Sequence, residues 1–85
     1  MTRPFRPDLL LYTRSECPLC EEMLHALQAM PEIGGCSLEL ADVDADPEAR
    51  RRYGLKVPVL LMDGELVCHG RLDPAELRKA LAAGR

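Results

Sequence analysis

The chain has 85 residues and a formal charge of -3 at pH 7, with 14 acidic and 11 basic side chains. Folding a chain of this length buries only about 60% of its unfolded surface, enough for one modest core, so we expect a single domain over residues 1–85. A composition of 47% apolar and 29% charged residues excludes a disordered or fibrous chain, and the lack of a dominant basic face argues against a nucleic-acid partner.

The first segment, from Met1 to Pro7, is basic and interrupted by prolines. It lacks the apolar centre of a secretory signal, and no stretch of the chain approaches the roughly 20 apolar residues that a membrane-spanning helix needs. We therefore expect a cytoplasmic, monomeric protein without a membrane partner.

A strand over Asp8–Tyr12 is the first predicted element, and its continuous apolar run favours burial on both faces of a sheet. From Pro18 onward, apolar residues recur every three or four positions, which indicates an amphipathic helix. These positions are Cys20, Met23, Leu24, Leu27 and Met30. Pro31 and the pair Gly34-Gly35 end this helix.

A second strand is predicted over Ser37–Val43, because apolar and polar residues alternate in its first half. Asp46 and Pro47 then begin a short helix, with the aspartate as N-cap and the proline at the first helical position. Gly54 marks its end. This helix contains Arg50-Arg51-Arg52, which we interpret as a solvated face, with contact to an anionic substrate as the alternative.

A third strand is predicted over Lys56–Met62. Asp63-Gly64 follows it and predicts a type I′ hairpin turn, so the next strand, Leu66–Cys68, should pair antiparallel. Asp73-Pro74 repeats the cap-and-proline signal and begins a last helix that ends at Gly84. The positions of this helix that should face the core are Leu77, Ala80 and Leu81.

The resulting order, β-α-β-α-β-β-α, predicts an α/β fold with a four-stranded mixed sheet and three helices. Crossover connections between parallel strands are right-handed. The first and third helices should therefore lie on one face of the sheet and the second helix on the other.

Four cysteines in a reducing compartment are more often catalytic or metal-binding than paired in a structural framework. Cys17 and Cys20 form a Cys-Pro-Leu-Cys motif at a helix start, whereas Cys36 and Cys68 stand alone. A zinc site usually presents a second close pair, so we interpret the two isolated cysteines as free thiols. The motif predicts a dithiol redox site without a metal, and a four-cysteine metal site is the minor alternative.

In a dithiol site one sulfur attacks a disulfide and the other resolves the mixed disulfide. Cys17 is the predicted nucleophile, because the helix dipole and the unpaired N–H groups of the first turn stabilise its thiolate and Arg14 adds positive charge. Cys20, one turn deeper, is the predicted resolving thiol. Glu16 opposes the thiolate through its adjacent negative charge.

The element order, the Cys17-Pro18-Leu19-Cys20 motif and the Val57-Pro58 step before the third strand together resemble the thioredoxin fold and, within it, the glutaredoxins. The resemblance covers about Asp8 to Leu81. Glutaredoxins carry Cys-Pro-Tyr-Cys preceded by a basic residue; here Arg14 supplies the basic residue and Leu19 replaces the tyrosine.

The resemblance implies that Pro58 is cis and lies beside the active-site disulfide, with the backbone of Val57 free to pair with a substrate as an added strand. An ordinary trans proline at a strand start is the alternative. It also implies glutathione as a co-substrate, although only Gly70 and Asp73 of the loop that begins at His69 match the family pattern. Asp73 also has a sufficient role as a helix N-cap.

We interpret His69 as a surface imidazole, with substrate contact as the alternative. The substrate-binding positions that these arguments name are Arg14, Pro18, Leu19, Val57, Pro58, Gly70 and Asp73.

The leading hypothesis is a small thiol-disulfide oxidoreductase that exchanges with protein disulfides or glutathione mixed disulfides and holds no bound cofactor. The alternative is an adaptor of the same fold that binds one protein client and has little general glutathione-dependent activity. The departures from the glutaredoxin pattern at Leu19 and in the loop after His69 motivate this alternative.

Overall fold

The structure is a computed structural model and describes residues 7–83. Its strands and helices are β1 (Asp8–Thr13), α1 (Pro18–Gln28), β2 (Ser37–Asp42), α2 (Pro47–Tyr53), β3 (Val59–Met62), β4 (Glu65–His69) and α3 (Pro74–Ala83). Two short 3-10 helices, η1 (Pro31–Gly35) and η2 (Val43–Ala45), flank β2. The predicted order of strands and α-helices is confirmed.

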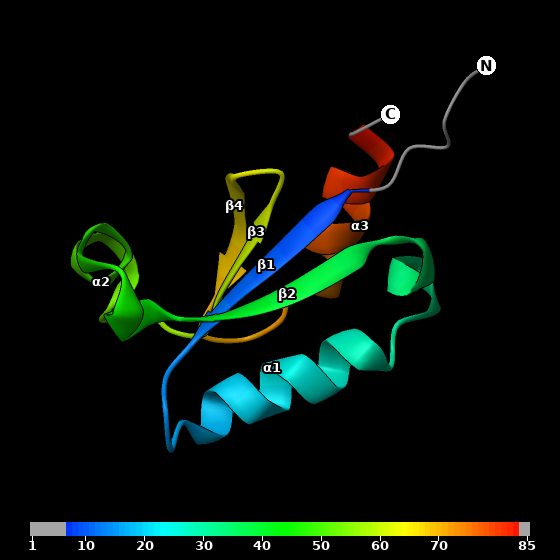
Figure 1. The fold of residues 1–85 in the computed structure, drawn as a ribbon. Helices are drawn as coiled ribbons and strands as arrows, with labels where there is room; N and C mark the ends of the chain where they lie inside the picture. The colour runs from blue at the N-terminus through cyan, green and yellow to red at the C-terminus, as the bar shows by residue number, and fades with distance from the viewer. Residues whose placement is uncertain (1–6, 84–85) are drawn as a thin grey trace.

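The four strands form one mixed sheet in the order β2-β1-β3-β4 (Figure 1). β1 pairs parallel with β2 and antiparallel with β3, and β3 pairs antiparallel with β4. In the turn between β3 and β4, φ is 51° at Asp63 and 88° at Gly64, the positive values that a type I′ turn requires. The predicted hairpin is therefore confirmed.

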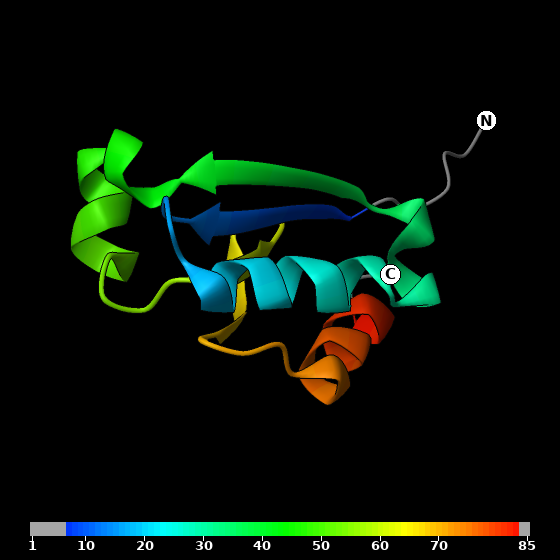
Figure 2. The same ribbon diagram turned by 90° about the horizontal axis from the view of Figure 1, so that it is seen from below.

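The helices α1 and α3 pack on the same face of the sheet (Figure 2), as predicted. The buried side chains of this core come from both helices, β1, β3 and the residue after α1's C-cap: Leu9, Leu11, Met23, Leu27, Met30, Leu60, Met62 and Leu77. Ala80 and Leu81 of α3 pack against this cluster. Apolar burial on this face is the main source of the fold's stability.

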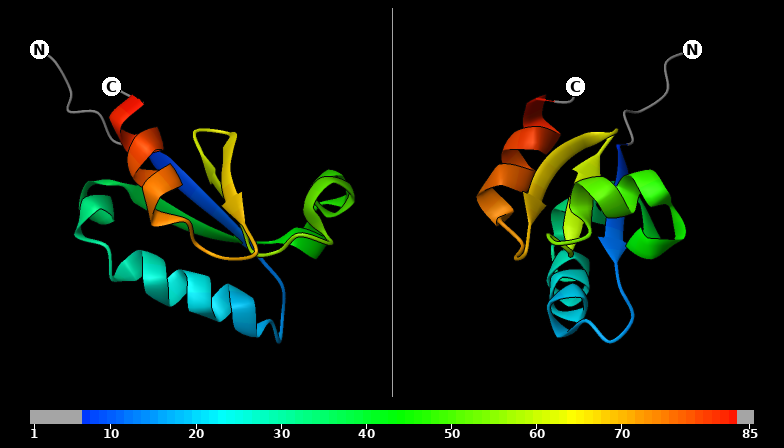
Figure 3. Two further views of the ribbon diagram at one scale, coloured as in Figure 1. Left: turned by 180° about the vertical axis from the view of Figure 1, so that it is seen from behind. Right: turned by 90° about the vertical axis from the view of Figure 1, so that its left-hand side faces the viewer.

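β1 is not buried equally on its two faces, contrary to the prediction. Leu9 and Leu11 are buried beneath α1 and α3, whereas Leu10 and Tyr12 on the opposite face are only partly buried. The second helix does not cover this opposite face as predicted, because α2 lies beyond the end of the sheet (Figures 1 and 3). It reaches the opposite face through Tyr53, whose ring stacks on Tyr12 with centroids 5.5 Å apart.

Prolines set two boundaries that differ from the predicted ones. α1 ends at Gln28, and Met30 is extended at φ -88° and ψ 117°, because a residue that precedes proline avoids the helical region. Gly34-Gly35 lies within η1 rather than ending α1. β3 begins at Val59 instead of Lys56, since the proline before Val59 has no N–H to donate to a ladder.

The remaining boundary differences are small. β2 ends at Asp42, whose side chain accepts a hydrogen bond from the N–H of Asp44 and so begins η2. β4 extends from Glu65 to His69, one residue longer at each end than predicted. The Asp46 cap and Pro47 start of α2 are confirmed, whereas the predicted end of α3 at Gly84 lies outside the described residues.

Candidate redox site

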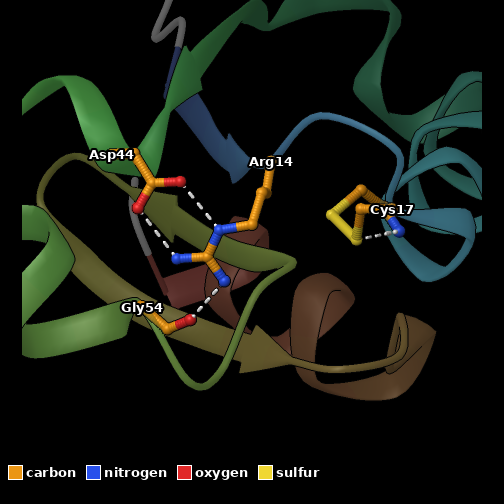
Figure 4. The surroundings of a disulfide bond; sticks show 5 residues. Arg14, Cys17, Asp44 and Gly54 are labelled. Carbon is orange, nitrogen blue, oxygen red and sulfur yellow. Dashed lines mark hydrogen bonds and ion pairs between the residues drawn. A yellow bond between two sulfur atoms is a disulfide. The ribbon is translucent and has the colours of Figure 1, made fainter.

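Cys17 and Cys20 lie at the beginning of α1 and are joined by a disulfide, with their Cα atoms 5.2 Å apart (Figure 4). Cys17 is the N-cap residue of α1, and its Sγ accepts a hydrogen bond from the backbone N–H of Cys20 at 3.2 Å. Pro18 occupies the first helical position, where an N–H would have no partner within the helix. A Cys17 thiolate would thus receive a hydrogen bond at the positive end of the helix.

The two sulfur-bearing residues differ in access to solvent. Cys17 is partly exposed, whereas Cys20 is 4% exposed. Leu19, between them, is 40% exposed, and Leu40 of β2 is 50% exposed and lines a small pocket together with both cysteines. The site therefore presents one partly exposed cysteine beside a pocket whose other lining residues are apolar Leu24 and Leu40 and polar Thr13, Arg14 and Glu21.

Glu16 precedes the motif in the left-handed backbone region, at φ 56°. This region is unfavourable for a residue with a Cβ atom, and such backbone conformations are frequent at functional sites. The conformation at Glu16 turns the chain from β1 into α1 directly before the N-cap.

The guanidinium of Arg14, whose charge is predicted to act on Cys17, is bonded to other residues. It donates two hydrogen bonds to the Asp44 carboxylate, at 2.8 and 2.9 Å, and a third to the carbonyl oxygen of Gly54 at 2.7 Å. Figure 4 shows the side chain turned away from the disulfide. The hydrogen bonds from Arg14 lower the pKa of Asp44, and those to Asp44 raise the pKa of Arg14.

The Val57–Pro58 peptide bond is cis, as the resemblance implied. The segment 54–58 lies at the end of the sheet where α1 begins (Figures 1 and 2). Within residues 7–83, no backbone hydrogen bond to Val57 is present outside the sheet ladders. None of these described bonds therefore occupies the backbone groups of Val57 that are predicted to pair with a substrate.

Gly70 and Asp73, the two positions that match the glutathione-binding pattern, both have structural partners. The N–H of Gly70, at φ 79°, donates to the carbonyl oxygen of Pro58 at 2.8 Å. Asp73 accepts from the N–H of Glu76 at 3.1 Å and caps α3. His69 is exposed at the end of β4, and all three arginines of α2 are exposed as well.

Cys36 and Cys68 carry no disulfide and are half-buried. Burial raises the pKa of both thiols, which makes them less reactive than an ordinary cysteine. Over residues 7–83, no three His, Cys, Asp or Glu side chains gather as a metal site would require. Within the same residues, every helix is too short or too polar to cross a membrane.

Sequence reasoning missed Asp44 and Gly54 as parts of this site. Asp44 lies 30 residues from Arg14 and Gly54 lies 40 residues from it, so neither contact has a local signal. The only available hint was the excess of acidic residues after β2, at the same sheet end as the motif.

The fold and the site define a class, the thioredoxin-fold proteins with a Cys-x-x-Cys pair at the beginning of α1. The structure is similar to a thioredoxin of Fasciola hepatica, with a TM-score of 0.58 and 21% identity over 94% of this chain and 82% of that one, a likeness that concerns the fold alone.

The family is narrower than this class. Residues 8–82 match the model of the Glutaredoxin-like domain (DUF836), and the chain belongs to this family.

Several similar proteins span nearly the whole chain. Protein Ne2328 of Nitrosomonas europaea has a TM-score of 0.80 and is 28% identical over 93% of this chain and 95% of its own. Target protein XcR50 of X. campestris has a TM-score of 0.67 and is 31% identical over 91% of this chain and 99% of its own. An uncharacterized protein of Mycobacterium tuberculosis is 29% identical over 91% of this chain and 84% of its own.

Proposed function

We propose that this protein is a thiol-disulfide oxidoreductase in which Cys17 attacks a protein disulfide and Cys20 resolves the intermediate. The observation that carries the proposal is the difference between Cys17 and Cys20 in solvent exposure and hydrogen bonding. Cys17 is partly exposed and its sulfur accepts a hydrogen bond from the Cys20 N–H at the N-terminus of α1, whereas Cys20 is buried. A nucleophile must reach its substrate as a thiolate, and a resolving thiol needs only to reach its neighbour.

The reaction begins from the reduced dithiol. The Cys17 thiolate attacks one sulfur of the substrate disulfide, which forms a mixed disulfide and releases the other substrate sulfur as a thiolate. Cys20 then loses its proton and attacks the Cys17 sulfur, which forms the Cys17–Cys20 disulfide and releases the second substrate thiolate. The substrate gains two electrons and the protein loses two, and a second thiol compound returns the pair to the dithiol.

Three features support a protein disulfide as the substrate in preference to glutathione. Leu19 and Leu40 offer apolar surface beside Cys17, and the Val57 backbone supports strand pairing with an extended peptide. Gly70 and Asp73 already have hydrogen-bond partners within the fold, which reduces what they can offer to the charged ends of glutathione.

The direct test is a single-turnover reaction of the pre-reduced protein with insulin, followed by acid quenching and mass spectrometry. The wild-type protein should reduce one insulin disulfide and end as the Cys17–Cys20 disulfide. Cys20→Ser should stop at a stable mixed disulfide with insulin, and Cys17→Ser should not react. Cys68→Ser is the matched control and should react at the wild-type rate.

Two outcomes would contradict the proposal. A Cys17→Ser protein that still reduces insulin would exclude Cys17 as the nucleophile. A wild-type protein that leaves insulin intact but reduces hydroxyethyl disulfide rapidly in the presence of glutathione would make a glutathione mixed disulfide the substrate instead of a protein.

A further inference from the structure

Arg14 joins three segments that are remote in sequence but meet at the redox site. It lies three residues before Cys17, on the connection from β1 to α1. Its guanidinium binds the carboxylate of Asp44 in η2 through two hydrogen bonds, and its third hydrogen bond reaches the carbonyl oxygen of Gly54 at the end of α2. A planar guanidinium suits this arrangement because it offers several N–H groups in fixed directions.

Gly54, which accepts this third hydrogen bond, lies where only a residue without a side chain fits. Gly54 is buried, and a Cβ atom at this position would lie 2.5 Å from the carbonyl oxygen of Arg50. The N–H of Gly54 donates to that same oxygen at 2.9 Å and closes α2. The backbone of Gly54 is therefore fixed by α2 on one side and by Arg14 on the other.

The segment 54–58 is held at both of its ends. Arg14 binds the carbonyl of Gly54 at the first residue, and the N–H of Gly70 binds the carbonyl of Pro58 at the last. Between these two bonds lie exposed Leu55 and the Val57 backbone. Of the described hydrogen bonds that hold this segment, the bond from Arg14 to Gly54 connects the segment to the loop that carries Cys17.

We propose that Arg14 is a positioning residue: together with Asp44 it holds the segment 54–58 against the Cys17 loop, so that a protein substrate can pair with the segment while its disulfide reaches Cys17. This inference rests on the proposed function. Arg14 acts through the geometry of the substrate-binding segment rather than through its charge on the sulfur, because Asp44 compensates that charge at hydrogen-bond distance.

The test compares Arg14→Met with Asp44→Asn in the single-turnover reaction, at increasing insulin concentration. Arg14→Met removes the bond to Gly54, so it should raise the half-saturating insulin concentration about tenfold, while the limiting rate stays within about twofold of wild type. Asp44→Asn removes the ion pair that orients the guanidinium, so it should raise the same concentration by a smaller factor. The double variant should be no worse than Arg14→Met alone, since Asp44 acts on the segment only through Arg14. If Arg14→Met does not fold, Asp44→Asn carries the test alone.

Arg78→Met is the matched control. Arg78 forms an ion pair with Glu32, 46 residues away, at 2.6 Å, so it too joins remote segments through an exposed guanidinium. The pair connects α3 with η1, and none of the described hydrogen bonds or ion pairs of either residue reaches the segment 54–58. Arg78→Met should leave the half-saturating insulin concentration unchanged.

The pKa of reduced Cys17 separates positioning from a direct charge effect. If Arg14 acted by its charge, Arg14→Met would raise the pKa of Cys17, and Asp44→Asn would lower it by exposing that charge. These opposite shifts would overturn the proposal. The positioning role predicts that both variants impair insulin binding in the same direction and leave the Cys17 pKa close to that of wild type.

Amide hydrogen exchange at Gly70 tests the inference independently of activity, because this N–H is bonded to the carbonyl of Pro58. It should exchange faster in Arg14→Met and Asp44→Asn than in wild type and Arg78→Met. Unchanged exchange in both variants would overturn the positioning role even if insulin is reduced. Faster exchange in a protein that never reduces insulin would support the connection while refuting the proposed function.

Discussion

The sulfur of Cys17 should react with iodoacetamide faster than any other thiol of the reduced protein. Cys17 is partly exposed, and its sulfur accepts a hydrogen bond from the backbone N–H of Cys20 at the beginning of α1. For a thiolate this becomes a charged hydrogen bond, which contributes about 1.5–3 kcal/mol, and the helix dipole adds about 0.3–1 kcal/mol. The neighbouring carboxylate of Glu16 offsets part of this stabilisation.

A net stabilisation of about 1.4 kcal/mol would increase the thiolate fraction at pH 7 nearly tenfold over that of a free cysteine. The two half-buried thiols have a smaller thiolate fraction than a free cysteine, because burial raises the pKa of Cys36 and Cys68. Cys17 should therefore be alkylated more than about tenfold faster than either of them at pH 7.

The assay uses the reduced Cys20→Ser variant, which cannot close the disulfide. Cleavage after glutamate places the three remaining cysteines on separate peptides, over residues 17–21, 33–39 and 66–76, and mass spectrometry then gives each rate. The Cys17→Ser variant is the control for Cys20, which should react slowly because it is 4% exposed. Alkylation of Cys36 or Cys68 at the rate of Cys17 would refute this account of the N-cap sulfur.

Three further predictions concern stability, measured by urea unfolding with far-ultraviolet circular dichroism. The hydrogen bonds from Arg14 lower the pKa of Asp44 in the folded state, so the ionised carboxylate stabilises the fold above about pH 4 and this stabilisation is lost as pH falls further. Asp44→Asn should lose less stability between pH 4 and pH 2 than wild type, and an equal loss of stability would contradict the role of this carboxylate. Burial raises the pKa of Cys68, so the contribution of this thiol to the free energy of unfolding is present below about pH 8.5 and is lost as pH rises through the folded-state pKa. Cys68→Ala should therefore lose less stability than wild type between pH 8 and pH 10, and parallel pH profiles would refute this. Glu16→Gly should raise the free energy of unfolding by about 0.5 kcal/mol, because glycine removes the strain of the positive φ angle and this gain exceeds the added chain entropy of the unfolded state. A lower free energy of unfolding would show that the Glu16 side chain stabilises the fold by more than its backbone strain destabilises it.

The parts of the fold that sequence reasoning predicted well have local signals. Asp46-Pro47 caps and begins α2, and Asp63-Gly64 adopts the two positive φ angles of its turn. The Cys17 cap is also local, because its partner is the N–H three residues later. In each case the residues that specify the conformation are close neighbours in the chain, so the sequence alone is enough to predict that conformation.

The parts that could not be predicted depend on contacts between remote segments. Nothing near Arg14 indicates that its partners are Asp44 and Gly54, and proximity in sequence alone suggested Cys17 instead. Gly54 was correctly predicted to end α2, but its structural importance comes from the close approach to Arg50 and the bond from Arg14. The partial burial of Leu10 likewise depends on where α2 lies in space.

A redox titration of the Cys17–Cys20 pair tests the central claim most directly. The protein is equilibrated in thiol-disulfide buffers of known potential, quenched by alkylation, and the fraction of disulfide is measured by mass spectrometry, with Cys36→Ser/Cys68→Ser as the background. We predict one reversible two-electron transition with a midpoint between about -150 and -300 mV, the range in which thiol-disulfide oxidoreductases work. A pair that stays reduced or stays oxidised across this range would contradict the proposed function.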